Sequence, residues 1–420
     1  MAPRTWVILG DKRGDNGQVE TIVDALSWPV ERKYVHMKPK YVLGKPRYRP
    51  SLDHLDLDQS DPLEAPWPDL ILTVGRRPSM AALWIRKQSG KRTKIVLVGK
   101  PSGHMRDFSL VIASAENQMP PLQNFLPTTL PLMRVSPEDV AADAAAWQTR
   151  FETLPRPLVA LLIGGETNPF IMNRKVAHEL VAIAHWVVNE LGGTPYVTTS
   201  RRTTAEVVEV LRRDLPPEAV FYQWSADAQE NPYRALLGSA DGFIVTADSV
   251  SMMVEVIYLH KALAIFPLPG GWLGRLDQRR RALAHWLFNP KRESTRDDWR
   301  HALGRGVHHL DFFKILSATR DFAAFHRLLV EKGLAVWAGE PFRQPDAALP
   351  DDVGAVVQRI EALFRWPRRG GRWAAPQTGA SFPPWTGRCA TRPLFAARKA
   401  GTRTVLAESP RPRRKAHAAP

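Results

Sequence analysis

Ser249 and Ser251 stand where a strand pattern gives way to a helical one, so backbone and hydroxyl donors could together bind a phosphate there. The preceding segment Phe243–Thr246 has the apolar, β-branched composition of a buried strand. Apolar residues then recur at helical spacing, at Val250, Met253, Val254 and Ile257. A helix start presents free N–H groups and partial positive charge, which suit a phosphate.

Two acidic residues belong to the same stretch. Asp248 has the residue type of a helix N-cap, and Glu255, one turn into the helix, could accept hydrogen bonds from a sugar hydroxyl. With the two serines they predict a site for a sugar phosphate. The alternative is an ordinary crossover helix whose polar residues cap only its own backbone.

An arginine pair, Arg201–Arg202, follows a second strand pattern at Tyr196–Ser200. Thr203 and Glu206 have the spacing of a capping box, which predicts a helix start directly after the pair. Open α/β sheets bind ligands at the carboxyl ends of their strands, and arginine forks pair with phosphate oxygens. The pair therefore predicts phosphate contacts, with two solvated loop arginines as the alternative.

Two glycine-containing turns also follow strand patterns. Gly164–Gly165 follows Leu158–Ile163, and the segment Gly10–Gln18 follows a first strand that begins at Thr5. Glycine allows a tight turn or a close approach of backbone to a ligand. The Gly10–Gln18 turn has the spacing of neither a P-loop nor G-x-G-x-x-G, so a plain strand-to-helix turn with a solvated charge cluster is its alternative.

Further strand patterns alternate with helical ones in both halves of the chain. They lie at Asp69–Gly75, Lys94–Gly99, Phe108–Ala113, Val220–Trp224 and Leu263–Pro267. This alternation predicts βαβ units and parallel sheets. Each half repeats one plan, a strand with a glycine turn and later a strand with an arginine pair. The predicted fold is α/β, with two Rossmann-like doubly wound domains that face a cleft.

Breaks in this pattern set the expected domain boundaries. An N-terminal domain is predicted over residues 1–153 and a C-terminal domain over 154–342, with an insertion at about 273–320. A helix within 343–366 is expected to cross back over the first domain. Residues 367–420 are rich in Pro, Gly, Ala and Arg and are predicted to form a disordered basic tail.

Charge and cysteine content limit the function classes. The formal net charge is +16, but residues 366–420 carry twelve Lys or Arg and one acid, so the tail holds +11 of it. Specific nucleic-acid binding by the folded part is therefore not expected, whereas the tail could touch an anionic membrane surface. The single cysteine, Cys389, and the lack of long apolar runs favour a cytoplasmic protein, peripheral at most to the inner face of a membrane.

Several motifs together resemble the elongated-mitochondria family of mitochondrial fission proteins and its bacterial relatives. The match covers about residues 5 to 342, and its motifs are Gly10–Asp11, Gly14–Asn16, Gly75–Arg77, Leu162–Gly165, Val197–Thr203, Glu230–Tyr233, Val245–Met252 and Phe266–Gly271. Two features depart from the family pattern: residues 273–320 intervene after Gly271, and alanines at 323 and 324 dilute a basic and aromatic cluster.

The bacterial relatives look like the GT-B glycosyltransferase superfamily, and that resemblance implies a role for each motif. The donor nucleotide-sugar would lie on the C-terminal domain, and an acceptor would face the loop that contains Gly14, Asp15 and Asn16. The implied donor-side residues are Gly164, Gly165, Ser200, Arg201, Arg202, Thr203, Asn231, Asp248, Ser249, Ser251 and Glu255. Asp15 is the first candidate for the general base, with Asp11 and Asp107 as alternatives. Neither a metal nor another cofactor is expected, because the arginines and the helix start could hold a pyrophosphate.

Two functions remain open at this point. One is nucleotide-sugar-dependent transfer to a cell-envelope or lipid-linked acceptor, and the other is a non-catalytic GT-B-fold adaptor that binds a protein or membrane partner. An epimerase that uses G-x-G-x-x-G together with Tyr-x-x-x-Lys is set aside, because the glycine fingerprint does not occur.

Overall fold

The computed structural model describes residues 2–43, 49–101, 103–117, 123–133, 135–271, 320–345 and 349–364, and residues 276 and 279. All of them belong to a unit that spans Met1–Ala375. The insertion expected at about 273–320 and the tail expected at 367–420 therefore lie, almost entirely, outside the described residues.

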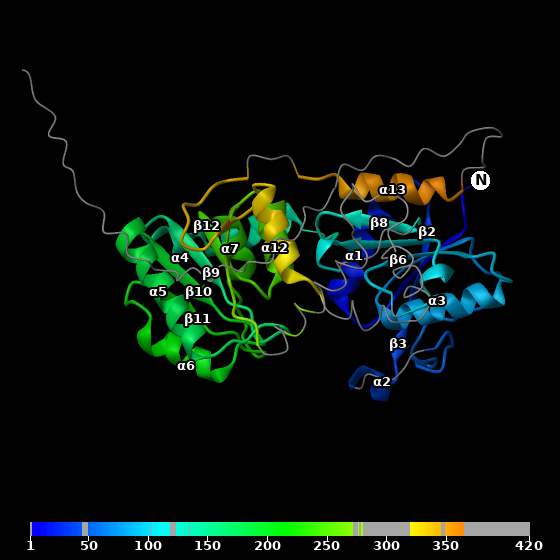
Figure 1. The fold of residues 1–420 in the computed structure, drawn as a ribbon, viewed down its shortest axis with the longest axis horizontal. Helices are drawn as coiled ribbons and strands as arrows, with labels where there is room; N and C mark the ends of the chain where they lie inside the picture. The colour runs from blue at the N-terminus through cyan, green and yellow to red at the C-terminus, as the bar shows by residue number, and fades with distance from the viewer. Residues whose placement is uncertain are drawn as a thin grey trace, which may run out of the picture. The chain divides into compact units, whose positions relative to one another are not determined.

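The N-terminal domain is built on a six-stranded parallel sheet, coloured blue to cyan in Figure 1. Its strands, in spatial order, are β2 (Val30–Tyr34), β1 (Thr5–Leu9), β5 (Leu70–Val74), β6 (Lys94–Val98), β7 (Leu110–Ser114) and β8 (Phe125–Thr128). A small antiparallel pair, β3 (His36–Met37) and β4 (Leu55–Asp56), stands apart from it. The accompanying helices are α1 (Arg13–Ala25), α2 (Pro39–Leu43) and α3 (Arg76–Gln88), with short 3-10 helices η1 (Met105–Asp107) and η2 (Ala115–Asn117).

The C-terminal domain has a second six-stranded parallel sheet, whose strands from the first part of the domain are green in Figure 1. Its spatial order is β11 (Val220–Tyr222), β10 (Thr194–Thr198), β9 (Leu158–Leu162), β12 (Gly242–Thr246), β13 (Ala262–Phe266) and β14 (Val336–Trp337). Numbered along the chain within this domain, the order is 3-2-1-4-5-6, which is the Rossmann order. Its helices are α4 (Pro137–Glu152), α5 (Arg174–Leu191), α6 (Ala205–Asp214), α7 (Tyr233–Ser239), α8 (Val250–Tyr258) and α12 (Phe322–Glu331).

The strands form where the sequence offers short apolar runs that can be buried on both faces. Every residue of β1, β5, β7, β9, β10, β12 and β13 is buried. In β1, Trp6 and Ile8 join one core cluster while Val7 and Leu9 join another, so helices and loops cover both faces of the sheet. The predicted pair of Rossmann-like α/β sheets is thus confirmed.

Helix α13 (Asp352–Ala362) packs against the N-terminal sheet, although it is the last described helix in the sequence. Val356 and Ile360 are fully buried in the core cluster that contains Val19 and Ile22 of α1. Asp351 caps the helix by accepting a hydrogen bond from the Gly354 N–H at 2.8 Å.

Strand order decides where a ligand would lie in each sheet. In the C-terminal sheet the order reverses between β9 and β12, and in the N-terminal sheet between β1 and β5. Adjacent loops diverge at such a switch point and leave a crevice outside the carboxyl ends of the strands. The Gly164–Gly165 turn follows β9 and Asp248–Ser249 follows β12, so the two predicted motifs of the second half meet at its switch point.

Candidate functional site

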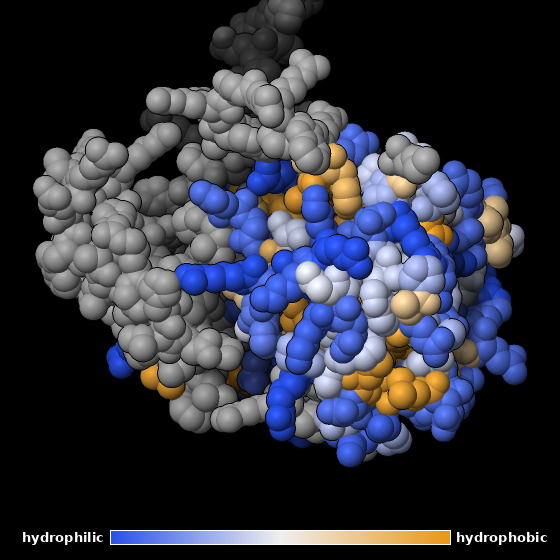
Figure 2. Space-filling model, turned by 90° about the vertical axis from the view of Figure 1, so that its right-hand side faces the viewer, coloured by the Kyte–Doolittle hydropathy of each residue, from blue (hydrophilic) through white to orange (hydrophobic). Residues whose placement is uncertain are grey.

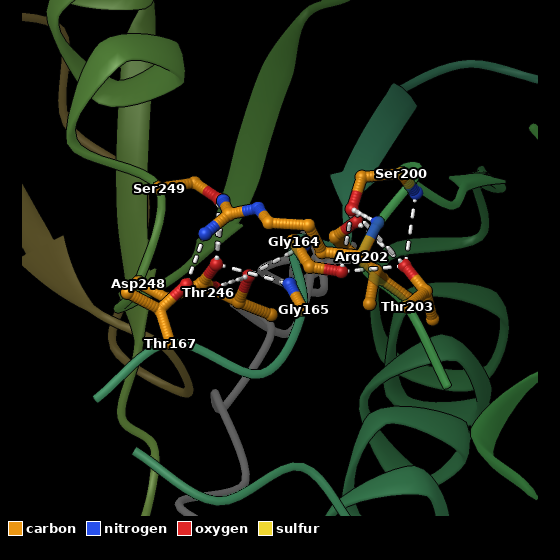
Figure 3. Close-up of polar contacts among 10 residues, drawn as sticks. Gly164, Gly165, Thr167, Ser200, Arg202, Thr203, Thr246, Asp248 and Ser249 are labelled. Carbon is orange, nitrogen blue, oxygen red and sulfur yellow. Dashed lines mark hydrogen bonds and ion pairs between the residues drawn. The ribbon is translucent and has the colours of Figure 1, made fainter. Parts of the chain in front are cut away.

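The Gly164–Gly165 turn is held by side chains at the end of β12 and directly after it (Figure 3). The Gly164 N–H donates to Thr246 Oγ1 at 2.8 Å, and the Gly165 N–H donates to Asp248 Oδ2 at 2.9 Å. Thr246 Oγ1 in turn donates to Asp248 Oδ1 at 2.7 Å. Both glycine N–H groups therefore already have protein acceptors, and the Asp248 carboxylate lies where a phosphate could otherwise accept them.

Close packing accounts for the two glycines. A Cβ on Gly164 would lie 2.2 Å from Asp248 Oδ2 and from Ser249 Oγ, and a Cβ on Gly165 would lie 2.1 Å from the Arg202 carbonyl oxygen. Real Cβ atoms do not approach other atoms so closely, so only glycine fits at either position. Three loops converge on this turn, which is the close backbone approach that the sequence indicated.

Arg202 lies over the same turn, and both terminal nitrogens of its guanidinium group contact protein oxygens. Nη2 contacts Asp248 Oδ2 at 3.1 Å, and Nη1 donates to Thr167 Oγ1 (Figure 3). The Asp248 side chain is 0% exposed whereas that of Arg202 is 44% exposed. The carboxylate of this ion pair is therefore buried, and the guanidinium group is partly open to solvent. A guanidinium has five N–H donors, and the open side leaves some of them for a ligand. Arg201, the other member of the pair, is exposed.

Ser200 and Thr203 connect the loop after β10 to the Gly164–Gly165 turn by hydrogen bonds. Ser200 Oγ donates to the Gly164 carbonyl at 2.8 Å, Thr203 Oγ1 also contacts that carbonyl, and the Arg202 N–H donates to Ser200 Oγ at 3.2 Å. These predicted site residues thus have structural partners, and they orient the backbone of Arg202.

The capping box predicted from Thr203 and Glu206 is wrong. The N-cap of α6 is Thr204, without a side-chain cap bond, and Thr203 Oγ1 instead accepts from the Ser200 N–H at 2.9 Å. The Glu206 carboxylate accepts from the Arg174 N–H at 3.2 Å. Thr203 bonds within its own loop and to the Gly164 carbonyl, and Glu206 bonds to a residue of another loop, which the spacing could not reveal.

The first turn of α8 leaves backbone donors for a ligand. Ser249 is the N-cap but forms no side-chain cap bond, and its hydroxyl donates to Asp248 Oδ2 at 3.2 Å. The N–H groups of Val250, Ser251 and Met252 have no hydrogen-bond acceptor within the described part of the chain. Met253 is the first whose N–H is bonded, to the Ser249 carbonyl at 3.2 Å. Ser251 is exposed, so its hydroxyl adds a donor at the same end.

Glu255 lies one turn along α8 and contacts Tyr233 of α7. The Tyr233 hydroxyl donates to Glu255 Oε2, and burial raises the pKa of both groups. Asn231, another predicted binding residue, accepts from the Tyr233 N–H at 3.0 Å, and Pro232 is the N-cap of α7. A sugar hydroxyl would have to share the Glu255 carboxylate with the Tyr233 hydroxyl, or displace that hydroxyl from the carboxylate.

The predicted acceptor loop in the N-terminal domain is shorter than expected, because α1 already begins at Arg13. Gly14 and Asp15 therefore stand in its first turn, where a carboxylate suits the helix dipole. Asp15 is half-exposed and lies 3.9 Å from Lys12 Nζ. Its Oδ2 atom would be 3.6 Å from a Cβ on Gly75, so Asp15 reaches across the switch point between β1 and β5.

Asn16 has a structural role in that turn. Its Nδ2 donates to the Gly10 carbonyl at 2.8 Å, and its Oδ1 accepts from the Gly10 N–H at 3.2 Å.

The other two candidates for the general base, besides Asp15, each lie beside a histidine. Asp11 lies 3.3 Å from His36 Nδ1, and Asp107 lies 3.3 Å from His104 Nδ1.

A family model described as mitochondrial fission ELM1 matches residues 13–299 of this sequence. This chain belongs to the mitochondrial fission ELM1 family. It is 27% identical over 222 residues to the mitochondrial fission protein ELM1 of Arabidopsis thaliana, a match that covers 47% of this chain and 51% of the plant protein. The match thus spans about half the length of that relative. A second match, 23% identical over 301 residues, is an uncharacterized protein of Rickettsia prowazekii, and it covers 63% of this chain and 83% of that one.

Solved structures with a similar chain path include enzymes of two kinds. A glycosyltransferase from Rickettsia africae has a TM-score of 0.38 at 11% identity, covering 79% of this chain and 94% of that one. A UDP-GlcNAc 2-epimerase from Methanocaldococcus jannaschii also has a TM-score of 0.38 at 11% identity, with 74% and 99% covered.

Four residues of this ELM1-family protein near the described site were not singled out from the sequence. Thr167 and Thr246 contact Arg202 and Gly164, and the only sequence signal for Thr246 is a polar residue at the end of a buried strand. Glu116 is a buried carboxyl after β7, and His326 of α12 is buried beside Ala247. Glu116 accepts hydrogen bonds from its neighbours Ser114 and Asn117, whereas His326 reaches the site from far along the chain, so spacing in the sequence does not mark it.

Neither a metal cluster nor a membrane-spanning helix is found in the part of the chain that the structure describes. No group of three or more His, Cys, Asp or Glu side chains there is arranged to hold a metal ion. None of the described helices combines the length and the apolar character that crossing a bilayer requires. Where Figure 2 colours the surface by hydropathy, the face that it draws is mainly hydrophilic, with separate small apolar patches.

Proposed function

We propose that this ELM1-family protein binds the diphosphate of a nucleotide-sugar at the N-terminus of α8 and transfers the sugar to a cell-envelope or lipid-linked acceptor. The observation that carries the proposal is the set of backbone N–H groups at Val250, Ser251 and Met252, which have no acceptor among the described residues and lie at the switch point of the sheet. An anion placed there would accept several donors and face the positive end of the helix dipole.

Arg202 supplies the second part of the proposed cradle. Asp248 and Thr167 fix one side of its guanidinium group, while the exposed side remains for a phosphate oxygen. Preorganised donors of this kind stabilise the negative charge on the diphosphate of the leaving nucleotide without reorganisation, which is the usual basis of electrostatic catalysis. Glu255 would hold a sugar hydroxyl, and Asp15 would accept the proton of the acceptor hydroxyl. The acceptor would be presented in the cytoplasm, at the inner face of the membrane.

Ligand-dependent thermal stability tests the proposal. UDP, GDP, CDP and ADP are each added to the full chain, and at least one of them is expected to raise the melting temperature because it binds only the folded state. Arg202→Ala should remove that shift, whereas Arg213→Ala, at an exposed arginine of α6, should keep it. The absence of a shift with all four nucleotides would count against a nucleotide-sugar site.

A non-catalytic adaptor is the second candidate, and one observation favours it. The Gly164 and Gly165 N–H groups and the Glu255 carboxyl already have partners within the protein, so the turn is complete without a ligand. An adaptor should keep its cellular function when Glu255 is changed to Gln and Ser251 to Ala. Loss of complementation by this folded double variant would favour the transferase.

A further inference from the structure

Tyr233 is a motif residue that has no part in the function proposed so far. It is the first residue of α7, it packs against the core of the C-terminal domain, and its hydroxyl donates to Glu255 Oε2 of α8. Burial and the charge of Glu255 raise the pKa of Tyr233, so the hydroxyl keeps its proton at neutral pH and is the donor in this contact. One oxygen of the Glu255 carboxylate therefore has a fixed protein partner.

The loop before α7 fixes the position of Tyr233. Glu230 accepts two hydrogen bonds from the guanidinium group of Arg150, in α4, at 2.6 and 3.1 Å. Asn231 Oδ1 accepts from the Tyr233 N–H at 3.0 Å. The motif Glu230–Tyr233 thus anchors the backbone from which the tyrosine ring reaches α8.

The second oxygen of the carboxylate, Glu255 Oε1, is open to a ligand. It has no hydrogen-bond partner among the described residues, and Glu255 is partly exposed. Oε1 is not one of the described polar atoms that are buried without a partner, so solvent reaches it. The pair therefore presents one occupied oxygen and one available oxygen.

Glu255 lies on the same face of α8 as Ser251. Four residues separate the two, so their side chains are neighbours, about 6 Å apart along the helix axis. Side chains of an α-helix lean toward its N-terminus, which brings the carboxylate toward the N–H groups of the first turn. A sugar attached to a diphosphate on those N–H groups would therefore meet Glu255 Oε1.

We propose that Tyr233 is a positioning residue, whose hydroxyl holds Glu255 Oε2 so that Oε1 accepts a hydrogen bond from a ring hydroxyl of the sugar attached to the diphosphate. The proposal rests on the function proposed above, because the diphosphate places the sugar beside α8. Without the tyrosine hydroxyl the carboxylate could rotate, and ordering it again on binding would cost conformational entropy. The donor is then a sugar with a free ring hydroxyl, and the sugar adds to the affinity of the nucleoside diphosphate.

Binding of nucleoside diphosphates and their glucose conjugates to the full chain tests the proposal. UDP, GDP, CDP and ADP are each compared with UDP-, GDP-, CDP- and ADP-glucose by calorimetric titration. Tyr233→Phe is expected to weaken the tightest glucose conjugate about tenfold, while the corresponding diphosphate changes less than about twofold. Equal weakening of the two ligands would indicate a general loss of structure and would overturn the proposal. So would a wild type that binds no glucose conjugate more tightly than its diphosphate.

Tyr222→Phe is the matched control. Tyr222 also donates to the loop before α7, at the Glu230 carbonyl and 2.9 Å, but its hydroxyl does not contact Glu255. This variant should bind the glucose conjugate as the wild type does. A loss as large as that of Tyr233→Phe would assign the effect to the loop instead of the Tyr233–Glu255 contact, and would overturn the proposal.

A double-mutant cycle shows whether Tyr233 acts through Glu255. Glu255→Ala removes the carboxylate and should weaken the glucose conjugate about tenfold or more, again with little change for the diphosphate. Adding Tyr233→Phe to this variant should weaken binding no further, because the group that the tyrosine positions is already gone. Two effects that multiply in the double variant would overturn the proposal.

The midpoint of urea denaturation gives a readout that needs no ligand. Tyr233→Phe should lower the midpoint of the wild type but not that of Glu255→Ala, where the hydroxyl has already lost its acceptor. Equal lowering in both backgrounds would overturn the positioning role. If the wild type binds none of the nucleotides, the proposed function fails and the sugar contact fails with it, whereas the midpoints still decide whether Tyr233 holds Glu255.

Discussion

Arg202 and Asp248 form an ion pair between the loops after β10 and β12, with Nη2 and Oδ2 3.1 Å apart. Asp248 Oδ2 also accepts from the Gly165 N–H, so one buried carboxylate connects three loops of the C-terminal sheet. The arginine and the aspartate had both been predicted as ligand-binding residues. The structure gives Asp248 a protein role, and it leaves Arg202 with one open side for a ligand.

Asp248→Asn should destabilise the protein. The amide Nδ2 is itself a donor, and it could not accept from the Gly165 N–H and Arg202 Nη2 as the carboxylate oxygen does. Losing hydrogen bonds to a charged, buried group costs about 1.5–3 kcal/mol, and the half-exposed Arg202 places the expectation at the lower end. Urea denaturation measures the loss. Asp143→Asn, which breaks an exposed pair with Arg234, is the control and should change stability little. Equal effects of the two substitutions would contradict the central role of Asp248.

Gly165→Ala should be much more disruptive than an alanine in open space. A Cβ at Gly165 would meet the Arg202 backbone at 2.1 Å, so the β9 and β10 loops would have to separate. Gly17→Ala is the matched control, because a Cβ there meets nothing within 4 Å and the residue lies inside α1. Alanine is favoured over glycine in a helix by about 1 kcal/mol, so Gly17→Ala should raise the melting temperature while Gly165→Ala lowers it. A tolerated Gly165→Ala would show that the loops can move apart.

The fold could be predicted from the sequence because its signal is local. Runs such as Leu158–Leu162 are apolar throughout and can be buried on both faces, which only a sheet covered by helices on both sides provides. The glycine turns and arginine pairs at the ends of these runs then follow from the geometry of parallel sheets. The sequence could also place Ser249 at a helix start, and it is the N-cap of α8.

The partners of the polar side chains could not be predicted, because they depend on strand order. Asp248 and Thr203 have the residue types of helix caps, yet in the structure they contact Gly165 and Gly164, which are brought near only when β9 pairs with β10 and β12. His326 contacts Ala247 because α12 returns to the sheet far along the chain. Spacing rules describe neighbours in sequence, so they miss each of these contacts.

Glu116→Gln should stabilise the protein at neutral pH, since Glu116 is a carboxyl that folding buries. Its Oε1 accepts from Ser114 Oγ at 2.7 Å and from Asn117 Nδ2 at 3.2 Å, whereas its Oε2 is buried without a partner among the described residues. Burial raises the pKa of Glu116 above its usual value of 4.5, although the charge of Arg320 opposes the shift. The folded state therefore holds this proton more tightly than the unfolded chain does.

The sign of the pH dependence follows from that difference. The stabilising contribution of Glu116 is fully present below pH 4.5 and is lost as the pH rises through the raised pKa of the folded state. Glutamine carries no charge at any pH, and its Oε1 can still accept from Ser114. Glu116→Gln should therefore melt above the wild type at pH 7.5, by about 2–4 °C for each 1 kcal/mol relieved, and the gap should close toward pH 4.5. The control Glu190→Gln, at an exposed carboxyl near the end of α5, should show no such trend. A wild type that melts above Glu116→Gln at pH 7.5 would mean that Glu116 is ionised and stabilised by its surroundings.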